Sequence, residues 1–164
     1  PLLRPLRPGT SLIARLFRSM ADPGTSILLV EDDALDTMNV ERELRKLQIS
    51  VPLRKCRNGR EALDLLREAL TQPPLAPLPS VVLLDINMPR MNGLEFLAEI
   101  RQDERLRGLQ VFVMTTSEED TDRTRAAALG VAGYIVKPLT FERFGEGGTG
   151  VDGFSLFVEL LKLK

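Results

Sequence analysis

Short apolar runs alternate with amphipathic stretches through the middle of the chain. The short runs are rich in aliphatic and β-branched residues, and turn-forming residues bound them, which is typical of β-strands. The sequence therefore predicts five strands, at residues 26–31, 51–56, 80–85, 110–115 and 132–136.

Between these runs, apolar residues recur at three- and four-residue spacing, which predicts amphipathic helices. These helices are expected at residues 35–47, 59–70, 93–103 and 118–129. Alternating strands and helices indicate an α/β fold with a parallel sheet. The continuous apolar run VVLL at 81–84 predicts burial on both faces, so helices should cover both sides of the sheet.

The order of the strands follows from the handedness of the connections. Right-handed crossovers place the first and third strands side by side, in the order 2-1-3-4-5. In such a sheet, ligands bind beyond the carboxyl ends of the strands, where the strand order reverses. Reactive residues are therefore expected at the strand ends.

Composition narrows the possible functions. The 164 residues are 43% apolar and 27% charged, as expected for one soluble domain. Lys and Arg (22) nearly balance Asp and Glu (23), which gives no electrostatic argument for a nucleic-acid partner. No apolar run reaches the ~18 residues of a membrane helix, so no membrane partner is expected. A single cysteine, Cys56, is expected to be buried on a strand in a reducing cytoplasm.

The chain contains no histidine. The commonest general base and the commonest metal ligand are therefore absent from this sequence, and Ser-His or Cys-His catalysis is excluded. Any phosphoryl group carried by this chain has to sit on another residue, such as a carboxylate, and has to come from outside.

Three carboxylates end neighbouring strands of the predicted sheet. Glu31 and Asp32 follow the first strand, and Asp85 ends the third. Like charges this close are costly unless a cation neutralises them, and Mg²⁺ prefers carboxylates, carbonyls and phosphate oxygens. Two metal pairs are possible, Glu31 with Asp32 or Asp32 with Asp33. Strand register favours the first, because Asp33 is well placed to cap the next helix.

The remaining strand ends supply groups suited to phosphoryl transfer. Thr115 ends the fourth strand and offers a hydroxyl, and Lys137 ends the fifth and offers a mobile cation. A metal, a Lys and a Thr around a nucleophile suffice for this chemistry, which depends mainly on positioning and charge stabilisation. Asp85 is the central carboxylate, and an ionised Asp can attack phosphorus without a base. We therefore predict that Asp85 is the nucleophile.

Together these residues resemble the receiver domains of two-component response regulators, a flavodoxin-like family, over about residues 26–139. The resemblance rests on six segments in order: ILLVED (27–32), LLDINMP (83–89), NG (92–93), VMTTS (113–117), GY (133–134) and VKP (136–138). The resemblance implies a CheY-like phosphoacceptor switch, not an enzyme acting on other substrates, that takes its phosphoryl group from a sensor histidine kinase in the cytoplasm.

The resemblance also implies roles for individual residues. Asp85 would be the phosphoacceptor and, with Glu31, Asp32 and the backbone carbonyl of Asn87, a ligand of Mg²⁺. Thr115 and Lys137 would contact the phosphoryl group, and the Lys137–Pro138 peptide bond would be cis. Tyr134 would swing inward when Thr115 moves toward the phosphate, and Ser117 with Asn87 would tune the lifetime of the phosphorylated state.

The two ends of the chain differ from the middle. Residues 1–24 are basic and are expected to form a poorly ordered N-terminal arm or leader, followed by a receiver domain at 25–144. The segment 145–164 begins with GEGGTG, which should weaken or break the last helix. This tail is similar to that of receivers paired with bacterial phytochromes, which implies a homodimer and light signalling. Only 27 residues follow Lys137 (164 − 137), so the expected output is a protein contact, an onward phosphotransfer or dimerisation.

Two other functions compete with this interpretation. An aspartyl phosphatase resembles a D-x-D pattern, whereas Asp85-Ile-Asn87 lacks the second acid that would protonate a leaving group. A binding module with an inactive pocket would lack acceptor-site residues, and all of them are present here. The kinase, the stimulus and the downstream target are not determined by the sequence.

Overall fold

The computed structural model describes residues 26–46, 51–72, 77–115 and 120–137. The expected arm (1–24), the tail with its glycine-rich start (145–164), Ser117 and the Lys137–Pro138 bond lie outside these residues.

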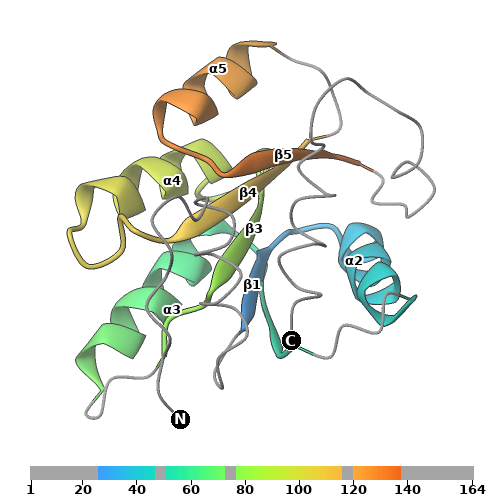
Figure 1. Ribbon diagram of the computed structural model, residues 1–164, viewed down its shortest axis with the longest axis horizontal. Helices are drawn as coiled ribbons and strands as arrows, with labels where there is room; N and C mark the ends of the chain where they lie inside the picture. Colours follow the sequence, from blue (N-terminus) through green and yellow to red (C-terminus); the bar gives the residue numbers. More distant parts are fainter. Residues whose placement is uncertain (1–25, 47–50, 73–76, 116–119, 138–164) are drawn as a thin grey trace, which may run out of the picture.

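Five parallel strands form one sheet in the order β2-β1-β3-β4-β5, as predicted (Figure 1). The strands and helices lie within two residues of their expected bounds. The helix expected from residue 118 is described from Asp120 onward. The elements are β1 (Ile27–Val30), α2 (Ala34–Lys46), β2 (Leu53–Cys56), α3 (Gly59–Thr71), β3 (Val81–Asp85), α4 (Gly93–Gln102), β4 (Gln110–Thr115), α5 (Asp120–Ala128) and β5 (Gly133–Val136).

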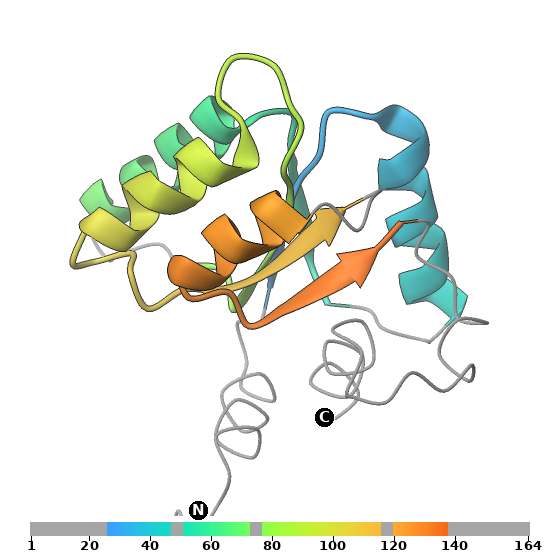
Figure 2. The same ribbon diagram turned by 90° about the horizontal axis from the view of Figure 1, so that it is seen from above.

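Both faces of the sheet are buried. Helices α3, α4 and α5 lie on one side of the sheet and α2 lies on the other (Figure 2). Alternate strand residues enter the core under the three helices: Leu28, Val30, Val82, Leu84, Val111 and Val113. The intervening residues Leu29, Leu83 and Phe112 are also fully buried. This confirms the prediction drawn from the apolar runs, because side chains alternate between the faces of a strand.

The register of the sheet brings the strand ends to a common edge. Val30 lies beside Leu84, so Glu31 follows β1 next to the position where Asp85 ends β3. Thr115 lies beside Val136, and the Lys137 amide donates to the Thr115 carbonyl over 2.8 Å. The strand-end residues are therefore neighbours through backbone pairing alone.

Side-chain caps begin the helices that leave this edge. Asn92 accepts a hydrogen bond from the Glu95 amide over 2.9 Å at the start of α4, which satisfies one of the free donors of a helix N-terminus. The first residue of α4, Gly93, donates to the Ile86 carbonyl over 2.8 Å. A side chain at Gly93 would collide with the backbone of Asp85 and Ile86, so glycine is required here by this close approach rather than by its backbone angles.

Cys56 ends β2 and is 2% exposed. Burial raises the pKa of its thiol to about 11, so the thiol is uncharged near neutral pH and unsuited to nucleophilic attack. This agrees with the expected packing role. In the described ranges, no helix combines the length and apolar character needed to cross a membrane.

Candidate functional site

Three carboxylates from two adjacent strands converge at the edge of the sheet. Glu31 and Asp32 directly follow β1, and Asp85 is the last residue of β3. One carboxylate oxygen from each lies within 4.8 Å of the other two. Glu31 and Asp85 are buried, at 4% and 6% exposed, whereas Asp32 is exposed. The sequence-predicted cluster is therefore assembled, with one side open to solvent.

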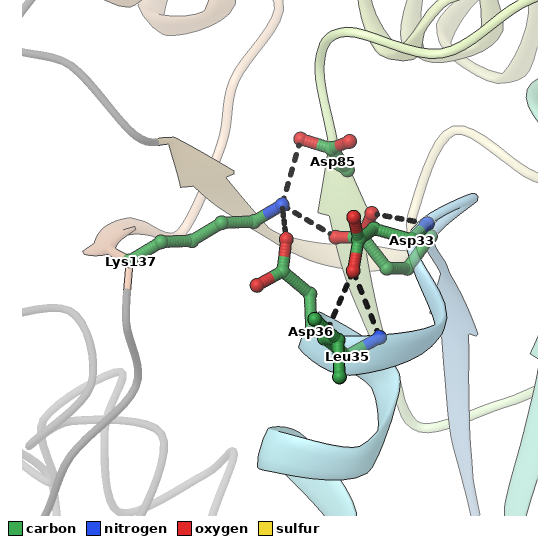
Figure 3. A network of polar contacts seen from close by, with 6 residues as sticks. Asp33, Leu35, Asp36, Asp85 and Lys137 are labelled. Atoms are coloured by element: carbon green, nitrogen blue, oxygen red, sulfur yellow. Dashed lines mark hydrogen bonds and ion pairs between the residues drawn. The ribbon is translucent and has the colours of Figure 1, made fainter.

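Lys137 reaches into this cluster from the end of β5 (Figure 3). Its Nζ lies 2.6 Å from Glu31 Oε2, 2.8 Å from Asp36 Oδ2 and 3.3 Å from Asp85 Oδ1. The Lys137 side chain is 7% exposed, so these ion pairs are shielded from bulk water. An ammonium group has three N–H donors, and each has a carboxylate within reach.

Asp33 has a different task from the other acids. Its Oδ1 accepts hydrogen bonds from the amides of Leu35 and Asp36, over 2.8 and 3.0 Å (Figure 3). Its own amide donates to Glu31 Oε1 over 3.0 Å. Asp33 therefore caps α2, and the carboxylates that converge are Glu31, Asp32 and Asp85, which favours Glu31 with Asp32 as the metal pair.

Burial and crowding shift the protonation of the cluster. Burial raises the pKa of Glu31 to about 7, although Lys137 and the Asp33 amide oppose the shift. Burial likewise raises the pKa of Asp85, against the attraction of Lys137. Burial alone would lower the pKa of Lys137, but hydrogen bonds to Asp36 and Glu31 outweigh it and raise that pKa. The lysine therefore stays a cation, while Glu31 and Asp85 hold protons more readily than ordinary carboxyls.

The donor set fits a hard divalent cation. All three converging groups offer carboxylate oxygens, which Mg²⁺ prefers, and the exposed Asp32 leaves room for water or phosphate ligands. A single ammonium cannot balance three carboxylates, and a doubly charged ion would relieve this repulsion. The residues therefore match the group that the sequence predicts.

The other predicted residues lie on β4, on β5 and in the loop after β3. Thr115 ends β4, next to the strand that carries Asp85, and is partly exposed. Asn87 is exposed and lies two residues beyond Asp85, in the loop that follows β3. Tyr134 lies on β5 and its hydroxyl donates to the Arg123 carbonyl of α5 over 2.7 Å. The roles of these three residues remain predictions.

Sequence reasoning missed Asp36. This residue lies in the first turn of α2 and contacts Lys137, which is 101 positions away in sequence. The sequence did contain a hint of this position. Asp36 lies three residues after the capping Asp33, so its side chain projects from the same end of the helix as the cap. Its pairing with Lys137 depends on how α2 packs on the sheet.

Comparison with known proteins agrees with this geometry. Residues 27–146 match the family model of the response regulator receiver domain. The chain belongs to this family, whose members act as phosphoacceptor switches in two-component signalling.

Among its relatives is a protein of Methanothrix harundinacea named "Probable methanogenesis regulatory protein FilR2", which is 41% identical over 116 residues, covering 71% of this chain and 74% of the relative. Response regulator Rcp1 of Synechocystis sp. is 32% identical over 136 residues, covering 83% and 92%.

Solved structures of such proteins share the fold. The bacteriophytochrome response regulator AtBRR superimposes with a TM-score of 0.68 at 32% identity, covering 87% of this chain and 96% of that one. The Mn²⁺-bound form of Rcp1 superimposes with a TM-score of 0.62 at 33% identity, covering 73% and 85%. The protein is thus related to phytochrome response regulators, and one of its relatives holds a divalent metal.

Proposed function

We propose that this protein accepts a phosphoryl group on Asp85 from a sensor histidine kinase, in a Mg²⁺-dependent reaction, and signals through protein contacts. One observation carries the proposal. Asp85 ends the central strand within 4.8 Å of two further carboxylates, and its Oδ1 lies 3.3 Å from the buried ammonium of Lys137. A nucleophile, a place for a metal cation and a permanently charged ammonium thereby meet at one edge of the sheet.

The chemistry follows from this arrangement. An Asp85 oxygen attacks phosphorus, and an O–P bond forms as the N–P bond of the kinase phosphohistidine breaks and its electron pair returns to the imidazole. Mg²⁺ held by Glu31, Asp32, Asp85 and the Asn87 carbonyl would neutralise the carboxylates and the phosphoryl oxygens. Lys137 and the Thr115 hydroxyl donate hydrogen bonds to those oxygens. In the absence of histidine in this chain, water attack on the phosphorylated state has no imidazole base to assist it.

Phosphorylation would be read out at the surface through Thr115 and Tyr134. Movement of Thr115 toward the phosphoryl group empties space beside β5, which the Tyr134 ring then occupies. Such a change is a shift between two existing states, because the phosphoryl group binds one position of the hydroxyl better.

The proposed donor is a cytoplasmic kinase domain. Leu35 and Met38 on α2 are 71% and 61% exposed, and α2 begins beside the acid cluster. Apolar side chains on this helix would supply a docking contact for the kinase near the acid cluster. The likeness to AtBRR supports a phytochrome-type kinase, and hence light signalling, as the first donor to test.

We further propose a homodimer, which sedimentation before and after phosphorylation would detect.

The acceptor is tested by incubating the full chain with acetyl phosphate and Mg²⁺, followed by intact-protein mass spectrometry. We expect the mass of one added phosphoryl group, its absence without Mg²⁺, and its absence in Asp85→Asn. A matched control is Asp64→Asn, an exposed acid of α3 paired with Arg60, which should be labelled like the parent.

Two outcomes would overturn the proposal. Failure of the parent to be labelled would indicate a binding module with an inactive pocket. Continued turnover of a phosphomonoester, abolished in Asp85→Asn, would indicate a phosphatase.

A further inference from the structure

Lys137 forms ion pairs with two of the three carboxylates that would hold a metal ion. Its ammonium lies 2.6 Å from Glu31 Oε2 and 3.3 Å from Asp85 Oδ1, and both residues belong to the converging carboxylates. The lysine and a divalent cation therefore compete for the same negative charge, because each is stabilised by close contact with it.

Asp36 is the one Lys137 partner among these contacts that lies outside the metal-ligating group. Its Oδ2 is 2.8 Å from Lys137 Nζ, but the three carboxylates that converge do not include it. In Figure 3 the lysine ammonium lies between Asp85 and Asp36, with Asp36 on the side of α2. Asp36 thus offers the ammonium an acceptor that a bound metal would leave untouched.

The position of Asp36 is held by the helix start. Its amide donates to the capping Asp33 over 3.0 Å, and the Asp33 amide in turn donates to Glu31 over 3.0 Å. The Asp36 side chain is 30% exposed and that of Lys137 is 7% exposed, so the ion pair is only partly screened by solvent. This chain of contacts fixes Asp36 relative to the ligand Glu31.

We propose that Asp36 is a positioning residue that raises the affinity of the site for Mg²⁺ by drawing Lys137 off the metal ligands. This rests on the metal site of the proposed function. When the ammonium gives up Glu31 and Asp85, its bond to Asp36 keeps it beside the acceptor, where it can donate to an incoming phosphoryl oxygen.

Two physical effects of removing the Asp36 charge have the same sign. Lys137 would lose Asp36 as an acceptor and would form stronger ion pairs with Glu31 and Asp85. These ion pairs compete with metal binding. The site would also lose a nearby negative charge that attracts cations. Both effects weaken Mg²⁺ binding, and only the first depends on Lys137.

The test is isothermal titration of the full chain with MgCl₂, in the parent, Asp36→Asn, Lys137→Met and the double variant. We expect Asp36→Asn to weaken Mg²⁺ binding roughly three- to tenfold, on the scale of a partly shielded ion pair. Lys137→Met should bind Mg²⁺ more tightly than the parent. When Lys137→Met is already present, adding Asp36→Asn should change the Mg²⁺ affinity by about twofold or less. A double-mutant cycle gives this result when one residue acts through the other, because removing Lys137 removes most of the effect of Asp36.

Controls separate this effect from general damage. Asp36→Glu keeps the charge and should recover part of the affinity, and the remote Asp64→Asn should match the parent. Circular dichroism checks that each variant is folded. If Asp36→Asn is not folded, Asp36→Ser takes its place, because serine is well tolerated near a helix start.

The inference is overturned if Asp36→Asn binds Mg²⁺ as tightly as the parent or more tightly. It is also overturned if the loss is equal with and without Lys137, since Asp36 would then act only as a distant charge. Magnesium titration needs no phosphorylation. A parent that binds Mg²⁺ but is never labelled on Asp85 would therefore refute the proposed function and leave this inference intact.

Discussion

The Tyr134 hydroxyl donates a hydrogen bond to the backbone carbonyl of Arg123 over 2.7 Å, and the Arg123 guanidinium lies over the Tyr134 ring at 5.4 Å from its centroid. The hydrogen bond and the cation–π contact join β5 to α5. Inward movement of the ring, as the proposed switch requires, would have to break this hydrogen bond.

Tyrosine fluorescence should therefore report the switch. Tyr134 is the only tyrosine in a chain without tryptophan, so its emission reflects this one environment. We expect beryllofluoride with Mg²⁺ to change the emission of the parent, and the change to vanish in Asp85→Asn. An unchanged spectrum despite tight binding of beryllofluoride would contradict a role for Tyr134 in the switch.

Substitution of Gly93 should displace the acceptor. In Gly93→Ala the new Cβ would lie against the Asp85 carbonyl oxygen and 2.8 Å from the Cα of Ile86, and backbone atoms cannot move aside cheaply. We expect the free energy of unfolding to fall by about 1–3 kcal/mol or more, together with weaker labelling of Asp85.

Gly108→Ala is the matched control for that variant. A Cβ at Gly108 would meet no atom within 4 Å, so urea unfolding should show little change or a slight gain in stability. Equal losses in the two variants would argue against a steric role for Gly93.

The stability of the metal-free protein should depend on pH through Glu31. Its pKa rises from 4.5 to about 7 on folding because the carboxyl is buried, so the folded state favours the protonated form. The corresponding stability is complete below pH 4.5 and is lost as the pH rises through 7. Asp85, whose pKa is also raised by burial, adds to the same trend.

Urea unfolding at a series of pH values without divalent metal measures this dependence. The free energy of unfolding should fall between about pH 5 and pH 8, and Mg²⁺ should reverse the fall by neutralising the ionised carboxylates. Glu31→Gln, which cannot ionise, should flatten the profile. A metal-free parent that gains stability over this range would show that the carboxylates are stabilised as anions.

Arg101 should be important for stability although it lies outside the candidate site. Its guanidinium donates to four backbone carbonyls, those of Arg107, Leu109, Leu129 and Gly130, over 2.7–3.1 Å. These bonds tie the end of α4 to the segments that precede β4 and β5. Arg101→Ala should lower the free energy of unfolding by about 2–4 kcal/mol.

Arg105→Ala serves as the comparison in the same chemical unfolding experiment. Arg105 pairs with Asp103 over 3.0 Å at the surface, and exposed ion pairs contribute little. A loss in Arg105→Ala as large as that in Arg101→Ala would show that the four backbone carbonyl contacts of Arg101 are not the cause.

The exposed apolar residues of α2 should affect the kinase and not the chemistry. We expect Leu35→Ser with Met38→Ser to slow phosphotransfer from the cognate kinase by about tenfold or more, because interface apolar anchors commonly contribute over 1 kcal/mol each. Labelling by acetyl phosphate should be unchanged, since the small donor needs no docking surface. Equal slowing with both donors would place the defect in the acid cluster.

Much of the fold was predictable because it depends on local patterns. Apolar runs and helical periodicity placed the strands and helices, since each pattern reflects which side of an element faces water. The strand order followed from the handedness of crossovers, and Asp85 and Thr115 were recognisable because each ends its strand, with Lys137 following the last. In α4 the buried residues Gly93, Phe96, Leu97 and Ile100 follow this three- and four-residue spacing.

The sequence by itself therefore determined the sheet, its order and the gathering of Glu31, Asp32 and Asp85 at one edge, because strand ends are neighbours whenever parallel strands pair in register. Only the tertiary structure decided that Lys137 rests against Asp36 and that Arg101 caps four carbonyls. The first contact joins two residues far apart in sequence. The second joins a helix to loop segments that have no periodic pattern of apolar residues. They depend on how each helix is rotated and packed against the sheet, which no local pattern specifies.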